Sequence, residues 1–595
     1  MFEDERQAVQ NQIKVFCAQN NLPDPGSLSW SPIPFSGKWG ISTSFFQLAA
    51  QEARAVKETT GKSPATPVPQ RAQEIAAAAA QFLGTPAGFT QVEAVKGYLN
   101  LFYTSGDYAR RVVDTVLDQG ASFGSGERRS ERVMVEFSQP NTHKAFHVGH
   151  LRSAILGDAL CRIYDFAGYE VVRANYPGDM GLHVIKWLWN YMKYHNGERP
   201  TQDITQWMGN VYADASRRLE ENPELESEVR LVYARWDQRD PEVVACWQET
   251  RQWSLDGFNE MYDILDIRFD RYYFNSEEEQ PGKLVVEALI RRGIASDERP
   301  AGPVIVKLDD LLGLKQEKYR VLVVLRSDNT ALYATEDLAL AMRKFSDYPD
   351  LVKSIYVVDV RQSPHFTQVF KTLEIAGYPW AERCIHIPYE VVSLPGNVVM
   401  AARDGTVVLL EDLIREAISR ALDVVREKNP TLAEEQMQSV ARAVGLGALK
   451  FPMLSRDNAK IVTFDWQTAL DFNGQAAPYI QYAHVRANSI LRKLEEPLPA
   501  PMTPAYELDP AEVQLIDLIS RLPGEVQRAA AEYKPLHLAN IAYDTARAFT
   551  DFYNQCPVLK AEPEKRLARL RLVAAARQTL ANTLNLLGIE APEVM

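Results

Sequence analysis

Residues 133–174 read VMVEFSQPNTHKAFHVGHLRSAILGDALCRIYDFAGYEVVRA, and this stretch decides the fold of the domain that contains it. It begins with a short β-rich run and ends with another. Between them, apolar residues recur at helical spacing from 156 to 167, until Gly168 ends the pattern. The stretch therefore predicts a βαβ unit with His147 and His150 at the entrance of its helix.

The helix entrance offers specific chemistry. Backbone N–H groups in the first turn of a helix lack partners and carry the positive end of the helix dipole, so they attract phosphate. Gly149 lets a ligand approach closely, while His147 and His150 share one face and can donate hydrogen bonds to phosphate oxygens. Charge that develops on a pentavalent α-phosphate would be stabilised there. The alternative is that the two histidines only cap the helix or fill the core.

The four residues His147-Val-Gly-His150 resemble the His-Ile-Gly-His motif of class I aminoacyl-tRNA synthetases, which nucleotidyltransferases of the same superfamily share. Segments 137–141, 144–153 and 178–181 narrow the resemblance to arginyl-tRNA synthetases. The resemblance implies an α/β fold: a Rossmann-like parallel-sheet catalytic domain, an N-terminal α/β accessory domain and a C-terminal all-helical domain. It also implies that the motif residues are catalytic.

The composition is that of a soluble globular protein. A chain of 595 residues with 46% hydrophobic and 24% charged residues suggests three or four domains. No apolar run approaches the roughly 20 residues of a membrane span. The N-terminus shows neither a secretory nor a transit signal, so we expect a cytoplasmic protein without membrane contact.

The cysteines and the net charge further limit the functions that are compatible with the sequence. Five widely spaced cysteines favour free buried thiols over disulfides or a structural zinc site, and we expect no protein-bound metal. The net charge of −13 disfavours nucleic-acid binding without excluding it, since local basic surface sets phosphate affinity.

We predict three domains, with boundaries at residues 1–127, 128–412 and 413–595, and a helical insertion at about 184–266 in the second. The small, flexible residues of 120–126 are typical of a linker. The first domain loosely resembles the extra N-terminal domain of arginyl-tRNA synthetases, which implies a contact with the outer corner of tRNA. A generic α/β accessory domain is the alternative.

The insertion and the second half of the catalytic domain show clear periodicity. Six tryptophans lie in the insertion, at positions 187, 189, 207, 236, 247 and 253. Tryptophans spread in this way are more often core residues than stacking platforms for bases. Strand patterns at 303–307, 321–325, 354–359 and 384–388 alternate with helices and predict a parallel sheet completed by right-handed crossovers.

A turn at 326–330 followed by a helix at 331–345 carries the expected substrate residues. An arginine substrate presents a planar guanidinium, which a fixed carboxylate binds strongly and selectively. The family resemblance implies that Tyr333, Asp337 and Gln362 bind the arginine side chain. It also implies that Asn141 binds the α-amino end. For Asp337 the alternative is a solvated charge that the helix dipole favours.

The second class I motif departs from the family pattern. Segment 399–405, Val-Met-Ala-Ala-Arg-Asp-Gly, occupies its place, and both motif lysines are missing. A cation near the transferring phosphates is still needed. Arg403 can supply one, and Lys144 can supply another, as the resemblance to relatives with an altered motif implies. A catalytically silent paralogue is the alternative.

From about residue 413 the pattern becomes helical, and segment 473–486 resembles the start of the family's anticodon-binding domain. Tyr479 or Tyr482 could stack on an unpaired anticodon base. The arginines expected to contact tRNA phosphates are Arg486, Arg566, Arg569 and Arg577. For any single residue, a solvated arginine or a core tyrosine is the alternative.

The resemblance implies a two-step reaction. ATP, accompanied by Mg²⁺, and L-arginine give arginyl-adenylate and pyrophosphate, and the terminal ribose of tRNA(Arg) then takes the arginyl group. It also implies that activation requires bound tRNA; we expect a monomer. The rivals are a small-molecule nucleotidyltransferase and a non-catalytic tRNA-binding paralogue.

Overall fold

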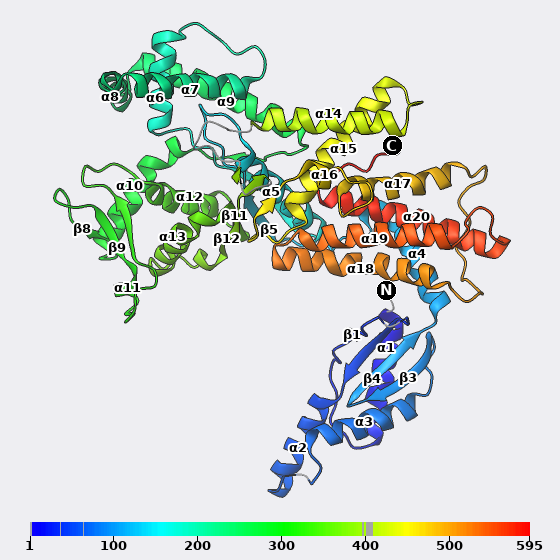
Figure 1. The fold of residues 1–595 in the computed structure, drawn as a ribbon. Helices are drawn as coiled ribbons and strands as arrows, with labels where there is room; N and C mark the ends of the chain where they lie inside the picture. Colours follow the sequence, from blue (N-terminus) through cyan, green and yellow to red (C-terminus); the bar gives the residue numbers. More distant parts are fainter. Residues whose placement is uncertain (1–2, 36, 64, 395–397, 400–408) are drawn as a thin grey trace. The chain divides into compact units, whose positions relative to one another are not determined.

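The structure is a computed structural model that describes residues 3–35, 37–63, 65–394, 398–399 and 409–595. The chain, whose helices and strands are labelled in Figure 1, divides into two compact units. The first comprises Met1–Phe123, Ala483–Leu522 and Asp544–Asn582, and the second comprises Gly124–Tyr482, Pro523–Tyr543 and Thr583–Met595. None of the helices in the described ranges combines the length and hydrophobicity needed to cross a bilayer.

A five-stranded parallel sheet lies at the centre of the second unit, in the order β12-β11-β5-β6-β7. Its strands are β5 (Arg132–Glu136), β6 (Glu170–Asn175), β7 (Arg271–Tyr272), β11 (Leu351–Asp359) and β12 (Cys384–Tyr389). Helix α5 (Val148–Phe166) joins β5 to β6, so the predicted βαβ unit is confirmed. Gly168 follows with φ of +102°, and a Cβ there would lie 2.0 Å from the Glu127 carbonyl oxygen, so only glycine fits.

Two predicted strands lie elsewhere. β9 (Val304–Lys307) and β10 (Val321–Leu325) pair antiparallel and form a separate sheet with β8 (Ser296–Asp297), so their assignment to the parallel sheet was wrong. Their connection contains only the four-residue helix α11 (Leu308–Leu311), whereas a parallel pair needs a crossover, usually helical. The first and third residues of β10 are exposed. Its sequence is apolar throughout and therefore resembles a strand buried on both faces, as in a parallel sheet.

The insertion is helical, as predicted. It consists of α6 (Leu182–Tyr194), α7 (Ile204–Glu221), α8 (Glu226–Asp237) and α9 (Pro241–Ile264). Four of its tryptophans are buried, at positions 187, 189, 236 and 247, and the other two pack against the same core cluster. The prediction that these tryptophans form a core is confirmed.

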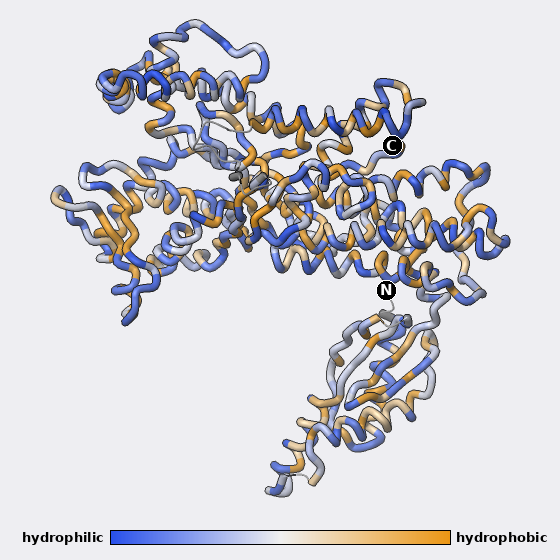
Figure 2. The backbone as a smooth tube through the Cα atoms, in the orientation of Figure 1, coloured by the Kyte–Doolittle hydropathy of each residue, from blue (hydrophilic) through white to orange (hydrophobic). Residues whose placement is uncertain are grey.

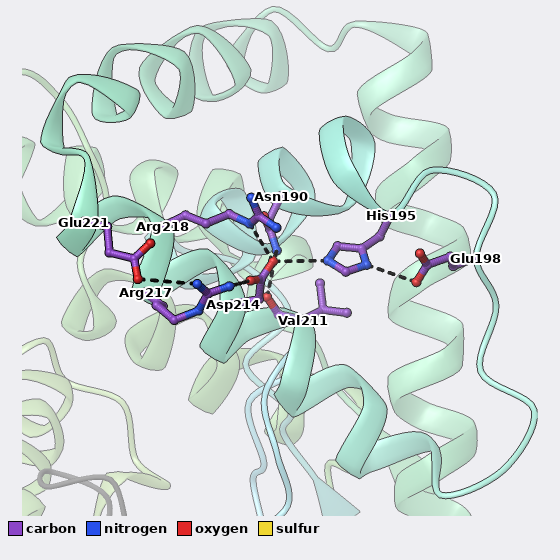
Figure 3. A network of polar contacts seen from close by, with 8 residues as sticks. All are labelled: Asn190, His195, Glu198, Val211, Asp214, Arg217, Arg218 and Glu221. Atoms are coloured by element: carbon purple, nitrogen blue, oxygen red, sulfur yellow. Dashed lines mark hydrogen bonds and ion pairs between the residues drawn. The ribbon is translucent and has the colours of Figure 1, made fainter.

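A polar network on one side of the insertion joins α6 to α7 (Figure 3). The Asp214 carboxylate accepts hydrogen bonds from Asn190 at 3.0 Å and from His195 at 3.2 Å, and it pairs with Arg218 at 2.7 Å. Burial alone would raise the pKa of Asp214, but the bonds from Arg218, Asn190 and His195 hold the pKa below its ordinary value. Asp214 therefore remains charged and ties the two helices together.

Further helices of the second unit follow β7 in the chain. They are α10 (Asn275–Arg291), α12 (Tyr333–Asp347), α13 (Ser363–Ile375), α14 (Leu410–Lys428), α15 (Glu434–Leu454) and α16 (Trp466–Ala469). A small sheet orders β13 (Val392–Leu394) between β14 (Val398–Val399) and β15 (Val462–Thr463). Hydrophobic and hydrophilic residues alternate along α14 in Figure 2, and its buried residues include Leu413, Ala417, Ala421 and Val425, which are four positions apart.

The N-terminal residues form an antiparallel sheet in the order β1-β2-β4-β3, flanked by helices, so the α/β accessory fold is confirmed. Its elements are α1 (Glu3–Gln19), β1 (Ser31–Pro32), β2 (Gly40–Ser44), α2 (Phe46–Thr60), α3 (Val68–Leu83), β3 (Phe89–Val95), β4 (Tyr98–Tyr103) and α4 (Ser105–Gln119). The C-terminus is helical, as predicted, with α17 (Ala477–Arg492), α18 (Pro510–Glu532), α19 (Leu536–Gln555) and α20 (Pro563–Leu586).

Candidate active site

The two histidines cap the entrance of α5. Nδ1 of His147 accepts a hydrogen bond from the Gly149 N–H at 3.1 Å, and Nδ1 of His150 accepts one from the His147 N–H at 3.4 Å. Their rings stack with centroids 4.0 Å apart. Because Nδ1 accepts in both rings, the proton of each neutral imidazole belongs on Nε2, where it can be donated to a ligand. Capping and ligand binding therefore use different nitrogens of the same side chains.

Both histidines are neutral near pH 7. Burial, and secondly the positive charge of Lys144, lower the pKa of His147 to about 4. Burial lowers the pKa of His150 well below its ordinary value, and the charges of His147 and Lys144 act in the same direction. The pair therefore offers hydrogen-bond donors rather than fixed positive charge.

A cavity that opens to solvent lies beside the histidines. Its lining comes from the entrance of α5, from Asp359 and Arg361 after β11, and from residues 389–392 after β12. These elements meet at the carboxyl ends of the strands, where the sheet order reverses between β11 and β5. Ligands of open parallel sheets bind at such a switch point.

Arg152 lines the same cavity, but its terminal nitrogens already donate to backbone carbonyls. Its side chain is buried, and its Nη2 donates to the carbonyls of Asn458 at 3.2 Å and Lys460 at 2.9 Å. Its Nη1 donates to the carbonyls of Glu390 and Val391. Burial lowers the pKa of Arg152 to about 10, and the guanidinium remains charged at pH 7. Arg152 therefore fixes the chain segments around the cavity, and sequence reasoning missed it because its partners lie far along the chain.

The residues predicted to bind arginine lie after β5 (Asn141), on α12 (Tyr333 and Asp337) and after β11 (Gln362). Asn141 and Gly178 form an isolated bridge, and a Cβ at Gly178 would lie 2.4 Å from Oδ1 of Asn141. Asn275, near Gly178, donates to the Tyr176 hydroxyl at 2.8 Å and to the Glu336 carboxylate at 2.6 Å. A row of contacts thus leads from Asn141 to the first turn of α12.

Asp337 lies one residue further along α12, and its Oδ2 is 2.6 Å from Nε2 of His365 on α13. Tyr333 is 73% exposed, and Gln362 ends the exposed 3₁₀ turn η3 (Val360–Gln362). None of Tyr333, Asp337 and Gln362 is among the described residues that line the cavity. The sequence also predicts one pocket that joins Asp337 to the His147 corner, and this stays a prediction.

Of the two cations expected to replace the motif lysines, the structure describes only Lys144. Arg403 lies outside the described residues. Lys144 is half-buried, with Nζ 5.0 Å from the ring centroid of Tyr212 on α7, and burial lowers its pKa. Its charge reaches His147, whose pKa it lowers. Lys144 is therefore close enough to the helix entrance to influence it.

A buried ion pair at the end of β5 was not foreseen. Nζ of Lys344 lies 2.6 Å from Oε2 of Glu136, and 3.6 Å from the ring centroid of Tyr356. Both charged side chains are almost completely buried. The pair joins α12 to the strand that precedes the histidine motif. The available signals were an acidic residue at the end of an apolar strand and a lysine beside the buried Phe345.

The predicted tRNA residues on α17 remain candidates. The ring centroids of Tyr479 and Tyr543 are 5.5 Å apart. Tyr482 is 39% exposed. The Arg486 guanidinium lies 4.9 Å from the ring centroid of Tyr553. The aromatic and basic groups expected for base stacking thus lie on one helix.

The arginines of α20 divide into two kinds. Arg566 and Arg577 are partly exposed. Arg569 is 4% exposed and pairs with Glu512 at 2.8 Å. Its prediction as a phosphate contact was wrong, since its charge is satisfied in the core.

Comparisons with known proteins agree with this geometry. Residues 112–466 match the family of class I (R) tRNA synthetase catalytic domains, and residues 480–595 match the DALR anticodon binding domain. The arginine–tRNA ligase of Clostridium perfringens is 36% identical over 511 residues, which cover 85% of this chain and 88% of that protein. The corresponding ligase of Bdellovibrio bacteriovorus is 35% identical over 533 residues, which cover 88% and 89%.

Solved structures give the same result. Arginyl-tRNA synthetase from Thermus thermophilus superposes with a TM-score of 0.78 at 29% identity, covering 99% of this chain and 100% of that one. The Plasmodium falciparum enzyme shares the fold with a TM-score of 0.72 at 19% identity, covering 100% and 99%. The fold and the histidine corner therefore define a class I aminoacyl-tRNA synthetase. Within that class, the chain belongs to the arginyl-tRNA synthetase family.

Proposed function

We propose that the chain activates L-arginine with ATP and transfers the arginyl group to the 3′ end of tRNA(Arg). The observation that carries this proposal is the stacked pair of His147 and His150 beside a cavity at the switch point of the sheet. In the first step, an arginine carboxylate oxygen attacks the α-phosphate and pyrophosphate leaves. In the second, a hydroxyl of the terminal ribose attacks the carbonyl carbon and AMP leaves.

The phosphates of ATP would lie at the entrance of α5. The positive end of the helix dipole and the Nε2–H donors of both histidines suit the charge that develops on the α-phosphate. Donors already fixed by the capping bonds need little reorganisation during reaction. Mg²⁺ bound to ATP would neutralise phosphate charge, and Glu390, which lines the cavity, offers an oxygen ligand of the type that this ion accepts.

Arginine would bind along the row of contacts that begins at Asn141. Asp337 would pair with the guanidinium, with Tyr333 and Gln362 beside it, while Asn141 would bind the α-amino group. A carboxylate that His365 already orients suits the planar fork of a guanidinium better than the single ammonium of lysine.

Further elements complete the proposal. Lys144 and Arg403 would supply positive charge near the leaving pyrophosphate. Tyr479, Tyr482, Arg486 and Arg566 would contact tRNA. We also infer that the enzyme acts as a monomer in the cytoplasm.

ATP–pyrophosphate exchange tests this function. Exchange should depend on arginine and on tRNA, and no other amino acid should support it. A chain that binds tRNA but shows no exchange would be a non-catalytic paralogue. Exchange that ignores arginine would instead indicate a small-molecule nucleotidyltransferase.

A further inference from the structure

The described lining of the cavity beside the histidines includes an exposed arginine that the reaction scheme above does not use. Arg361 lines it, and its side chain is 70% exposed. Its Nε donates to Oδ1 of Asp359 at 2.8 Å, and its Nη2 donates to Oδ2 of the same residue at 2.9 Å. One edge of this guanidinium is therefore held in place, while Nη1 has no hydrogen-bond partner within the described part of the chain.

Asp359 fixes Arg361 in two ways. Besides the fork of two side-chain bonds, its Oδ1 accepts the backbone N–H of Arg361 at 2.8 Å and caps the turn η3. Asp359 is itself only 17% exposed, at the carboxyl end of the central strand β11. The arginine is thus oriented before any ligand arrives, which reduces the entropy lost on binding.

The charges on the described lining residues favour such a cation. The histidines are neutral near pH 7, and the Asp359 and Glu390 carboxylates contribute negative charge. Both terminal nitrogens of Arg152 already donate to backbone carbonyls. Among the described lining residues, Arg361 is the positively charged group that retains terminal donors for a ligand. Without it, the described lining would repel a polyanion.

We propose that Arg361 binds the phosphate chain of ATP and that Asp359 positions it for this contact. The assignment rests on the proposed function and deepens it. The Arg361 side chain is 70% exposed, so a phosphate can bind its remaining donors while Asp359 keeps the other two. A guanidinium also matches two phosphate oxygens at once. The next residue, Gln362, belongs to the proposed arginine site, so the two consecutive side chains would serve the two substrates.

Equilibrium binding to the full-length chain tests this contact. ATP, adenosine and inorganic pyrophosphate are titrated separately against the wild type, Arg361→Gln and Arg361→Lys. We expect Arg361→Gln to weaken ATP and pyrophosphate binding about tenfold or more, since hydrogen bonds to charged groups are lost. Adenosine binding and the KM for arginine should change less than twofold. Arg361→Lys should recover part of the loss, because its charge remains without the fork.

Two further variants separate the contact from general effects. Arg320→Gln removes an equally exposed arginine whose partner, Glu317, is 3.9 Å away, and it should leave ATP affinity unchanged. Asp359→Asn should weaken ATP binding less than Arg361→Gln, since it loosens the guanidinium without removing it. Circular dichroism confirms that each variant is folded.

The results have distinct meanings. Unchanged ATP affinity in Arg361→Gln overturns the assignment. An equal loss for ATP and adenosine also overturns it, because the contact would then be to the nucleoside. In either case, arginine-dependent exchange by the wild type would leave the proposed function standing. If wild-type exchange fails, the proposed function falls, while the binding series still reports on Arg361.

Discussion

Replacing Asp337 with asparagine removes one negative charge at nearly constant volume. Asp337 is 17% exposed and sits in the first turns of α12, 2.6 Å from His365. If its carboxylate pairs with the substrate guanidinium, the variant leaves a charged group without its partner in a mostly buried site. Such truncations cost about 2–5 kcal/mol. The loss predicts a fall in kcat/KM for arginine of about 30- to 5,000-fold.

The assay is ATP–pyrophosphate exchange at varied arginine, together with calorimetric titration of ATP. ATP affinity should stay within about twofold of the wild type, because Asp337 is not among the described residues that line the histidine cavity. Asp310→Asn, an exposed acidic residue on α11, serves as the control and should change neither quantity. Exchange by Asp337→Asn within threefold of the wild type would refute the assignment of the arginine site.

Three further outcomes are expected. Lys144→Ala should lower kcat for activation by about 100-fold, because it removes positive charge near the transferring phosphates, as measured by exchange at saturating substrates. Gly178→Ala should raise the KM for arginine about tenfold or more, since the added Cβ would displace the Asn141 amide. The pKa of His147 is about 4 in the folded protein, against an ordinary value of 6.5. Below pH 6.5 the unfolded chain therefore binds a proton at this histidine that the folded chain does not, and the stability of the fold decreases. His147→Asn should therefore reduce the fall in thermal midpoint between pH 7 and pH 5.

Each outcome has a control. Arg217→Ala removes an exposed cation from the insertion and should leave kcat intact; a similarly small effect of Lys144→Ala would reject its role. Gly524→Ala meets no atom within 4 Å and should not alter the KM, and an unaltered KM in Gly178→Ala would contradict the placement of Asn141. If the pH dependence of His147→Asn matches that of the wild type, the burial of neutral His147 does not contribute to acid sensitivity.

Local physics accounts for what the sequence by itself determined. The two strands of the βαβ unit and the helix that Gly168 ends follow from side-chain periodicity and from a backbone conformation that only glycine tolerates. The histidine corner could also be predicted from the sequence, because the cap, the glycine and both rings lie within four residues. Burial of the tryptophans followed from their size and apolar character.

Only the tertiary structure decided which distant elements meet. The apolar runs at 304–307 and 321–325 suit either sheet, and the length of their connection, rather than their composition, paired them antiparallel. Lys344 could join Glu136 only after α12 packed on the central sheet, and Arg152 gained its carbonyl partners from residues about 240 to 310 positions away. Arg361 lies only two residues from its partner Asp359 in sequence, yet its approach to the histidines depends on the parallel pairing of β5 with β11. Such contacts depend on long-range packing, which no local pattern encodes.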